Sequence, residues 1–453
     1  LADDWVYLTA PNVNFNIKEA LMPQESFWRP LDALFGGLMG KIPSLFPILN
    51  RALVVSAHIL SAFFTGKILD ELNFKTKSKV FSVLFFSFSS ATISVIVSPD
   101  ALNQSFCLLF GLIGLYLYLR KNNFIYLTFV LISVFCKESG IAFLAVIPPF
   151  GTIKSISSFK DIKIKSEPVK RLIICAVIAV IFVAAYFALR FALYGSVALG
   201  GESSRYSVSV FSFSTIKNIY NMFLISATGV DSVAILLSPR NYILVALTVL
   251  LSLVFIAYMI VCFIHMIKAK SGLYGFVVII ISALILAAPQ AVIASSGEMH
   301  AYPVLFAVAV LYGYLLEYSD KKQTKKAVAF ILPVFIAFAI SSTHKMITIY
   351  DYSEKTKELT ENLYENYKDK SDKELILINI NGKRKGYSVF SQTPVCGTDF
   401  GKSLRQYYGW KKLNIYSTSR DSEEKAYKIA KEKKTEQNIV LITDGTSVKE
   451  FVE

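Results

Sequence analysis

Long runs of apolar residues, separated by short polar and basic segments, occupy most of the chain up to about residue 344. A helix needs roughly 20 such residues to cross about 30 Å of hydrocarbon. The pattern predicts helical membrane spans at residues 43–69, 79–98, 101–119, 172–194, 241–267, 273–294, 299–317 and 327–344.

A further apolar run, residues 124–153, is interrupted by Lys137 and Glu138, so it is either one long helix or two short ones. Two short helices place every short basic loop on one side of the membrane, whereas one long helix divides these loops between the two sides. We therefore expect two helices, each about 20 Å long and hence tilted or re-entrant. The basic loops are residues 67–79, 120–121, 154–171, 268–270 and 321–326.

This topology gives ten crossings, and eleven if a further span precedes Leu1, since the chain does not begin with Met and no apolar run precedes Asp3. We expect a membrane domain over residues 1–344 whose first outer loop is residues 1–42. The other outer segments are residues 98–100, 137–138, 195–240, 295–300 and 345–453.

Two outer segments have patterns of their own. Residues 195–240 alternate polar and apolar positions at 208–214 and then show helical spacing at 216–224, which predicts a loop with an interfacial helix. Residues 345–453 are charged and predict a small soluble α/β domain outside the membrane. Its expected strands are 374–380, 413–416 and 438–442, and its expected helices are 401–408 and 422–434.

The composition agrees with an all-α polytopic membrane protein that carries this small domain. Hydrophobic residues make up 54% of the chain and charged residues only 18%, against about 45–50% apolar residues in soluble proteins. The net charge of +14 lies in short clusters between apolar runs, so we expect a lipid bilayer and not nucleic acid as its partner. The cysteine and histidine spacing predicts no metal site.

The first outer loop carries the strongest candidates for chemistry. In a partly dry pocket the adjacent carboxylates of Asp3 and Asp4 repel, so that one is suited to act as a general base. The pair is also able to hold a divalent cation, and the alternative is a solvated loop acid or a helix cap. Arg29, in the stretch 28–31 (WRPL), suits phosphate recognition, although an interfacial anchor is the simpler reading of that stretch alone.

The other candidates lie at helix ends or inside apolar runs. Lys137 and Glu138 are costly in a bilayer, so they are either functional or an ion pair that fixes two short helices. We expect each to pair with another element, because neighbours on a helix point in different directions. Asp100 is expected to cap a helix, and His58 to be a packing residue. A polar cluster at the outer start of a helix is either functional or serves only to begin that helix at the membrane interface. That cluster is Glu298, His300 and Tyr302.

These motifs resemble those of the GT-C superfamily of membrane glycosyltransferases in their order along the chain and in their shared side of the membrane. The protein O-mannosyltransferases and their bacterial relatives are the nearest group. The resemblance covers residues 1–344. Val54 stands where that group has an Asn, and Met299 and His300 replace an Arg and a Tyr, which puts a phosphate role for that Arg in doubt. The matching stretches are Asp3-Asp4-Trp5, residues 28–31, the helix of His58, Ser98-Pro99-Asp100, Cys136-Lys137-Glu138-Ser139 and residues 298–303.

The resemblance implies transfer of a sugar from a polyprenyl-phosphate donor to a hydroxyl of a protein or glycan acceptor, with inversion, on the outer face of a bacterial inner membrane. One of Asp3 and Asp4 would be the base, and Arg29 with Lys137 would stabilise the leaving phosphate. Glu138, His300 and Tyr302 would line the donor site. No cofactor is implied beyond the possible divalent cation.

Three other functions compete with this one. A transporter or flippase of a lipid-linked substrate should show broken helices in both halves of the chain, and the sequence shows one such break, at Lys137 and Glu138. A polysaccharide polymerase or ligase would use a larger outer loop, for which residues 195–240 are the candidate. A receptor or structural role would leave the outward clustering of acids and cations without a reason.

Overall fold

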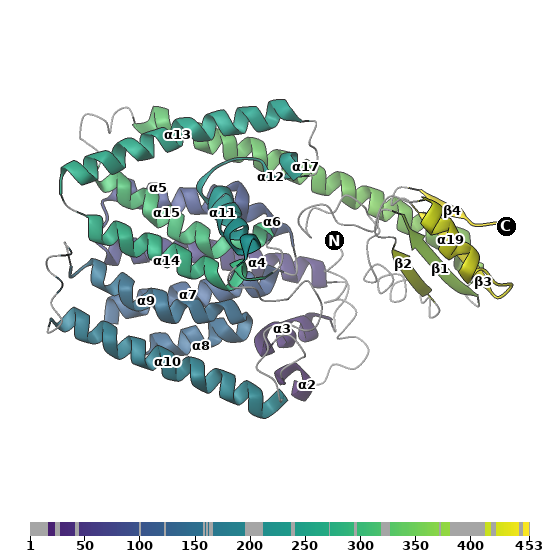
Figure 1. Ribbon diagram of the computed structural model, residues 1–453, viewed down its shortest axis with the longest axis horizontal. Coiled ribbons are helices and arrows are strands. Elements are labelled where there is room, and N and C mark those ends of the chain that lie inside the picture. The colour runs from purple at the N-terminus through teal and green to yellow at the C-terminus, as the bar shows by residue number, and fades with distance from the viewer. Residues whose placement is uncertain are drawn as a thin grey trace.

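A bundle of long apolar helices makes up most of the structure, and a small sheet domain follows it at the C-terminal end (Figure 1). Within the described residues eight helices are long and apolar enough to cross a membrane, which confirms that the eight long apolar runs predicted above form helices. The computed structural model describes residues 17–22, 28–40, 45–98, 101–121, 124–156, 159, 162, 166–194, 212–236, 241–270, 272–293, 297–318, 327–370, 373–380, 413–417, 423–443 and 447–452.

Most of the spans are single continuous helices, and they run in alternating directions through the bundle (Figure 1). Two short helices, α2 (Ile17–Leu21) and α3 (Pro30–Gly40), precede them. The continuous spans are α4 (Phe46–Glu71), α7 (Leu102–Lys121), α10 (Glu167–Tyr194), α13 (Tyr242–Lys268), α14 (Leu273–Ala291), α15 (Tyr302–Glu317) and the first part of α17 (Ala327–Tyr367).

The run 124–153 forms two helices, α8 (Tyr126–Cys136) and α9 (Ala142–Ile153), as the positions of the basic loops predicted. Lys137 is extended, with φ −157° and ψ 135°, and it ends α8 before the 3₁₀ helix η3 (Glu138–Ile141). A side chain at Gly140 would bring a Cβ to 2.6 Å from the backbone of Ser133, so the sharp turn needs glycine. The number of crossings stays a prediction, because both helices are shorter than a full span.

A second break divides the span that α5 (Thr76–Phe88) begins and α6 (Ile93–Val97) ends, with the 3₁₀ helix η1 (Ser90–Thr92) between them. The backbone N–H of Ala91 donates to the Ser89 hydroxyl at 3.3 Å, where an unbroken helix would use the Ser87 carbonyl. His58 Nε2 lies 3.2 Å from the Ser87 carbonyl oxygen instead. A side chain of α4 thus hydrogen-bonds a carbonyl that the break leaves without its helical partner.

Residues 212–236 contain the helix that the sequence predicted at 216–224, and its interfacial position stays a prediction. Helix α11 (Phe213–Ala227) packs against α14 and α15, and a non-helical stretch then leads to α12 (Ser232–Leu236). In that stretch the Gly229 N–H donates to Ser252 Oγ at 3.1 Å, and Ser341 Oγ donates to the Gly229 carbonyl at 2.6 Å. Ser252 is about 15 Å along α13 from its start, so this backbone lies inside the bundle, where protein groups satisfy it.

Of the alternating stretch 208–214, the last two residues belong to α11, and residues 208–211 lie outside the described part. Ser212 caps the start of this helix, since the Thr215 N–H donates to Ser212 Oγ at 3.3 Å.

The C-terminal domain contains a sheet with the strand order β2-β1-β3-β4. β1 pairs in parallel with β2 and β3, and the fourth strand, which the sequence analysis missed, is antiparallel. Helix α19 (Glu423–Lys433) packs on one face of the sheet through Ala426 and Ala430. The strands are β1 (Glu374–Asn379), β2 (Leu413–Ser417), β3 (Asn438–Thr443) and β4 (Val448–Glu450).

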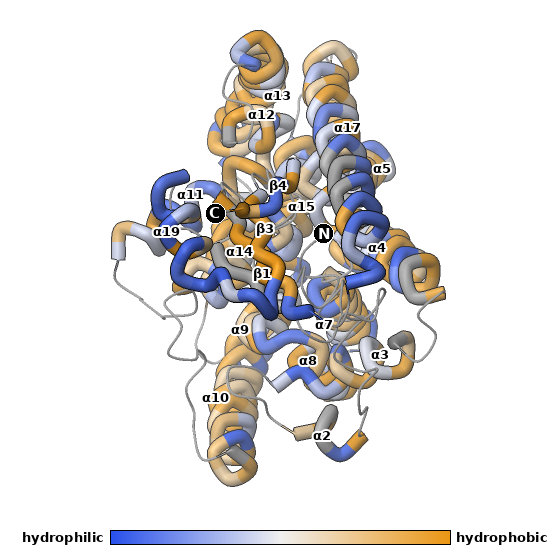
Figure 2. Tube along the Cα trace, turned by 90° about the vertical axis from the view of Figure 1, so that its right-hand side faces the viewer, coloured by the Kyte–Doolittle hydropathy of each residue, from blue (hydrophilic) through white to orange (hydrophobic). Residues whose placement is uncertain are grey.

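Helix α17 joins the bundle to this domain and continues without a break through residue 344, where the domain boundary was predicted. Its last turns and α19 are hydrophilic, in contrast to the helices of the bundle (Figure 2). After α17, the 3₁₀ helix η6 (Lys368–Lys370) leads toward the sheet. Tyr367 donates to Glu450 at 3.3 Å, and partial burial beside that carboxylate raises the pKa of Tyr367 to about 12. The expected helix at 401–408 lies outside the described residues.

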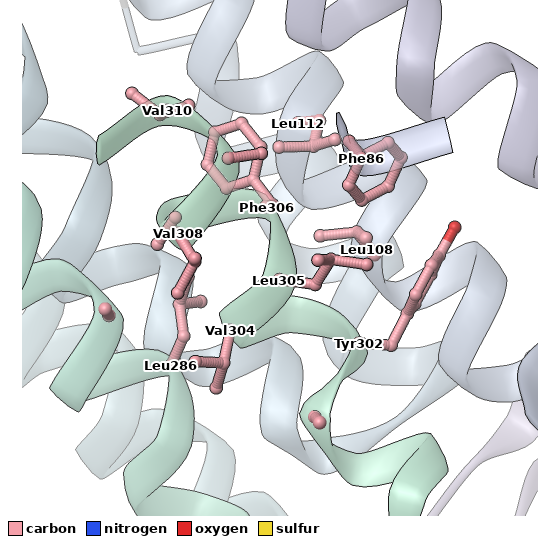
Figure 3. Packing of buried hydrophobic residues seen from close by; sticks show 14 of the residues in the cluster. Phe86, Leu108, Leu112, Leu286, Tyr302, Val304, Leu305, Phe306, Val308 and Val310 are labelled. Atoms are coloured by element: carbon pink, nitrogen blue, oxygen red, sulfur yellow. The ribbon is translucent and has the colours of Figure 1, made fainter. Parts of the chain in front are cut away.

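The core of the bundle is centred on α15. All residues from Ala301 to Val310 are buried, and Leu305 and Phe306 pack against α7 and its neighbours (Figure 3). The 3₁₀ helix η5 (Glu298–Ala301) directly precedes α15, and it contacts η1 and α14. The breaks η1 and η5 therefore meet at one end of the bundle.

Candidate functional site

The strongest link between distant motifs is the contact of Arg29 with Glu138. Arg29 Nε donates to Glu138 Oε2 at 2.8 Å, and the backbone N–H of Trp28 donates to Oε1 at 2.7 Å. The two side chains are 109 residues apart in sequence and 22% and 15% exposed. Both carboxylate oxygens of Glu138, at the break between α8 and α9, thus bind the loop that leads into α3.

Trp28 fixes the same loop from its other side. Its ring stacks on Tyr186 of α10 and contacts Phe135 of α8, both with centroids 5.4 Å apart, and Nε1 donates to the Leu21 carbonyl at 3.0 Å. Only 5% of Trp28 is exposed. The ring is therefore a packed structural residue, which argues against a simple membrane-interface anchor.

Several buried charged side chains lie around this contact. Lys137 is buried beside Glu138, and Arg190, fully buried near the end of α10, lies close to Tyr186. Asp32, in the first turn of α3, is the other buried carboxylate. Among the described residues this cluster therefore contains the cations Arg29, Lys137 and Arg190 and the carboxylates Glu138 and Asp32, and cations of this kind suit anion recognition. The sequence analysis missed Arg190, although a lone ionisable residue inside an apolar run is a signal for function.

The first turns of α7 hold the break in place. Ser133 of α8 donates to the Cys107 carbonyl at 2.7 Å, and the Cys107 thiol lies 3.4 Å from the same hydroxyl. One turn earlier, Asn103 donates to Asp32 at 3.4 Å. The helices α3, α7 and α8 are therefore tied together directly beside the Arg29 contact.

A second polar cluster surrounds Glu298, the first residue of η5. Its Oε1 accepts hydrogen bonds from the ammonium group of Lys345 and, at 2.6 Å, from the hydroxyl of Ser232. The Lys345 ammonium also donates at 3.1 Å to the carbonyl of Ser90 in the broken span. Glu298 and Lys345 are both fully buried. This ion pair joins α17, α12, η1 and η5.

Asp231 and His344 extend this cluster toward solvent. Asp231 Oδ1 accepts the N–H groups of Val233 and Ala234 at 2.9 Å each, and Oδ2 lies 2.8 Å from His344 Nδ1. The carboxylate is fully buried, while 19% of the His344 side chain is exposed. A buried carboxylate that fixes one nitrogen of an imidazole is an arrangement that orients the other nitrogen.

The remaining predicted residues have mixed outcomes. His58 and Tyr302 are buried and hydrogen-bond each other at 2.8 Å, so His58 is a packing residue with partners on both ring nitrogens, as predicted. His300 Nδ1 accepts the Gly297 N–H at 2.7 Å and caps η5, which favours helix-start chemistry. Asp3, Asp4 and Asp100 lie outside the described residues, so their convergence with Arg29 stays a prediction.

The two clusters lie at the same end of the bundle. In Figure 1 this is the end from which α17 leads to the sheet domain, and the start of α7, the end of α10 and the start of α15 all lie there. The ends of α4, α7 and α13, which carry the described basic residues of the short loops, lie at the opposite end. The separation of basic loops from the polar clusters agrees with the predicted sidedness.

Among the described residues no group of three His, Cys, Asp or Glu side chains is arranged to hold a metal ion. The acid pair proposed as a cation ligand, Asp3 and Asp4, lies outside those residues. Comparisons with protein families, curated proteins and solved structures found no match to this chain.

The contact of Arg29 with Glu138 predicts a stability effect. Glu138→Gln should lower the free energy of unfolding by about 1–3 kcal/mol, because the amide offers one acceptor oxygen where the carboxylate offers two to Arg29 and Trp28. Thermal unfolding of the purified protein in detergent measures this. The exposed pair Lys368 and Glu365 supplies the control, Lys368→Ala, which should have no measurable effect. Equal unfolding temperatures for both variants would contradict the assignment.

Proposed function

We propose that this protein is a membrane glycosyltransferase that moves a sugar from a polyprenyl-phosphate donor to an acceptor hydroxyl on the extracytoplasmic face. The observation that carries the proposal is the contact of Arg29 with Glu138, which joins the loop before α3 to the helix break beside Lys137. These are two of the stretches on which the resemblance to the GT-C superfamily rests.

The charge around that contact fits the phosphate of the donor. Arg29, Lys137 and Arg190 lie at one end of the bundle, where lipid headgroups would be. A guanidinium group binds phosphate oxygens through paired hydrogen bonds, and cations that stabilise a leaving phosphate lower the barrier to transfer. Glu138 would hold Arg29 in one orientation, and the apolar outer surface of α10 would lie against the isoprenoid chain.

The reaction we propose is a single displacement. A carboxylate of Asp3 or Asp4 takes the proton of the acceptor hydroxyl, and that oxygen forms a bond to the anomeric carbon with inversion. The bond from the anomeric carbon to the phosphate oxygen breaks, and the lipid phosphate leaves with both electrons beside Arg29. In the proposed topology ten spans cross a bacterial inner membrane, and the C-terminal domain lies outside.

A transporter of a lipid-linked substrate is the second candidate, and one observation favours it. Broken elements occur in both halves of the chain, at η3 and again in the stretch between α11 and α12. Such breaks are typical of transporters. The gathering of Arg29, Lys137 and Arg190 beside the first break, and the lack of an evident relation between the two breaks, favour the transferase.

A reconstituted assay separates the two. Purified protein in liposomes receives a polyprenyl-phosphate hexose with a labelled sugar and a hydroxyl acceptor peptide or glycan. A transferase yields labelled acceptor and free polyprenyl phosphate in equal amounts. Movement of the intact donor between leaflets without labelled acceptor would overturn the proposed reaction and support transport. Liposomes without protein give the background for both measurements.

A further inference from the structure

Gln104 is a fully buried side chain without an evident structural purpose. It lies in the first turn of α7, no part of it is exposed, and neither its amide oxygen nor its amide nitrogen has a hydrogen-bond partner among the described residues. Leaving a buried polar group unpaired costs roughly 1–3 kcal/mol. A leucine at this position would avoid that cost, so the amide requires another explanation.

Glu298 has the same property in one of its two oxygens. Oε1 is occupied by Lys345 and Ser232, while Oε2 is buried and has no hydrogen-bond partner among the described residues. The ion pair with Lys345 neutralises the charge of the carboxylate, but it gives the second oxygen no hydrogen bond. An acceptor oxygen therefore remains at the outer start of α15.

The helix geometry places these two groups at the same end of the bundle, on elements that share neighbours. Gln104 precedes Leu108 by four residues, so it lies on the same face of α7, one turn nearer the outer end. Leu108 packs beside Leu305 and Tyr302, and Leu112 lies near Phe306, so α7 and α15 run in the same direction (Figure 3). The turn above Tyr302 is η5, which begins with Glu298. Helix α6 contacts both α7 and η5.

We propose that Gln104 and Glu298 form the subsite that holds the sugar ring of the lipid-linked donor. An amide offers one acceptor oxygen and two N–H donors, and a carboxylate oxygen accepts, which together match neighbouring hydroxyls of a pyranose. Asn103, beside Gln104, contacts Asp32 on the side of the phosphate cluster, so sugar and phosphate would lie on adjacent faces of α7. The inference rests on the function proposed above.

The test uses Gln104→Leu in the full chain. Removal of an unpaired buried amide should leave the unfolding temperature unchanged or raise it. The KM for the donor should rise about tenfold, the loss expected for one or two hydrogen bonds to the sugar, and discrimination between epimeric hexose donors should fall. Ser282→Ala is the matched control. Ser282 is also fully buried, and its hydroxyl has no hydrogen-bond partner among the described residues, but it lies in the middle of α14.

A binding measurement separates this inference from the proposed reaction. Polyprenyl-phosphate hexose should stabilise the wild-type protein against heat more than polyprenyl phosphate alone, and Gln104→Leu should lose that difference. Equal stabilisation of the wild type by both lipids, or a Gln104→Leu variant with wild-type KM and selectivity, would overturn the subsite. Sugar-dependent stabilisation that is lost in the variant, without any transfer by the wild type, would support the subsite and reject the transferase.

Discussion

Exchange of both Asp3 and Asp4 for asparagine is expected to lower sugar transfer by about 10²–10⁴-fold, the contribution that a positioned general base makes. The acceptor hydroxyl is a poor nucleophile until its proton is removed, and asparagine does not accept that proton. Affinity for the donor should change little, because the phosphate is assigned to Arg29, Lys137 and Arg190. The measurement is the initial rate of transfer at saturating donor and acceptor.

The single variants Asp3→Asn and Asp4→Asn identify which carboxylate is the base, since only one of them should reproduce the large loss. Asp369→Asn is the control, because Asp369 is an exposed acid of the 3₁₀ helix that follows α17. Wild-type rates in the double variant would remove the base assignment. A donor that no longer stabilises the double variant would instead assign the pair to donor binding.

The hydropathy of the chain predicted the spans well because a membrane helix depends on local quantities. Length and apolar content alone decide whether a segment such as 242–268 crosses. The break at Lys137 followed from a second local quantity, the placement of basic loops. Glu138, in the same break, pairs with Arg29 of the stretch 28–31, so the contact joins two candidates that were chosen separately.

The second cluster was missed because its members are single polar residues whose partners are distant in sequence. The predicted last span, 327–344, ends just before Lys345, since a charge closes a hydropathy window. The backbone continues as a helix because a partner exists for that charge: Glu298, 47 residues away, and the Ser90 carbonyl, 255 residues away. Asp231 lay in a segment interpreted as a surface loop, and its two partners on α12 and α17 are visible only in the fold.

Replacement of Lys345 by methionine is expected to have the largest effect on stability. Removing one partner of a buried ion pair costs about 3–5 kcal/mol, because the other charge remains buried without compensation. Glu298 would keep only the Ser232 hydroxyl, and the Ser90 carbonyl in the broken span would lose its donor. Thermal unfolding in detergent measures the loss, and Lys357→Met, at an exposed position of the same helix, is the control.

A double variant decides whether the loss comes from the unpaired charge or from the shape of the side chain. Glu298→Gln combined with Lys345→Met removes both charges and keeps a hydrogen-bonding group for Ser232, so it should recover much of the stability lost in the single variant. Continued instability of the double variant would assign the loss to packing. A Lys345→Met protein that unfolds at the same temperature as Lys357→Met would show that the ammonium group does not hold α17 against η1 and η5.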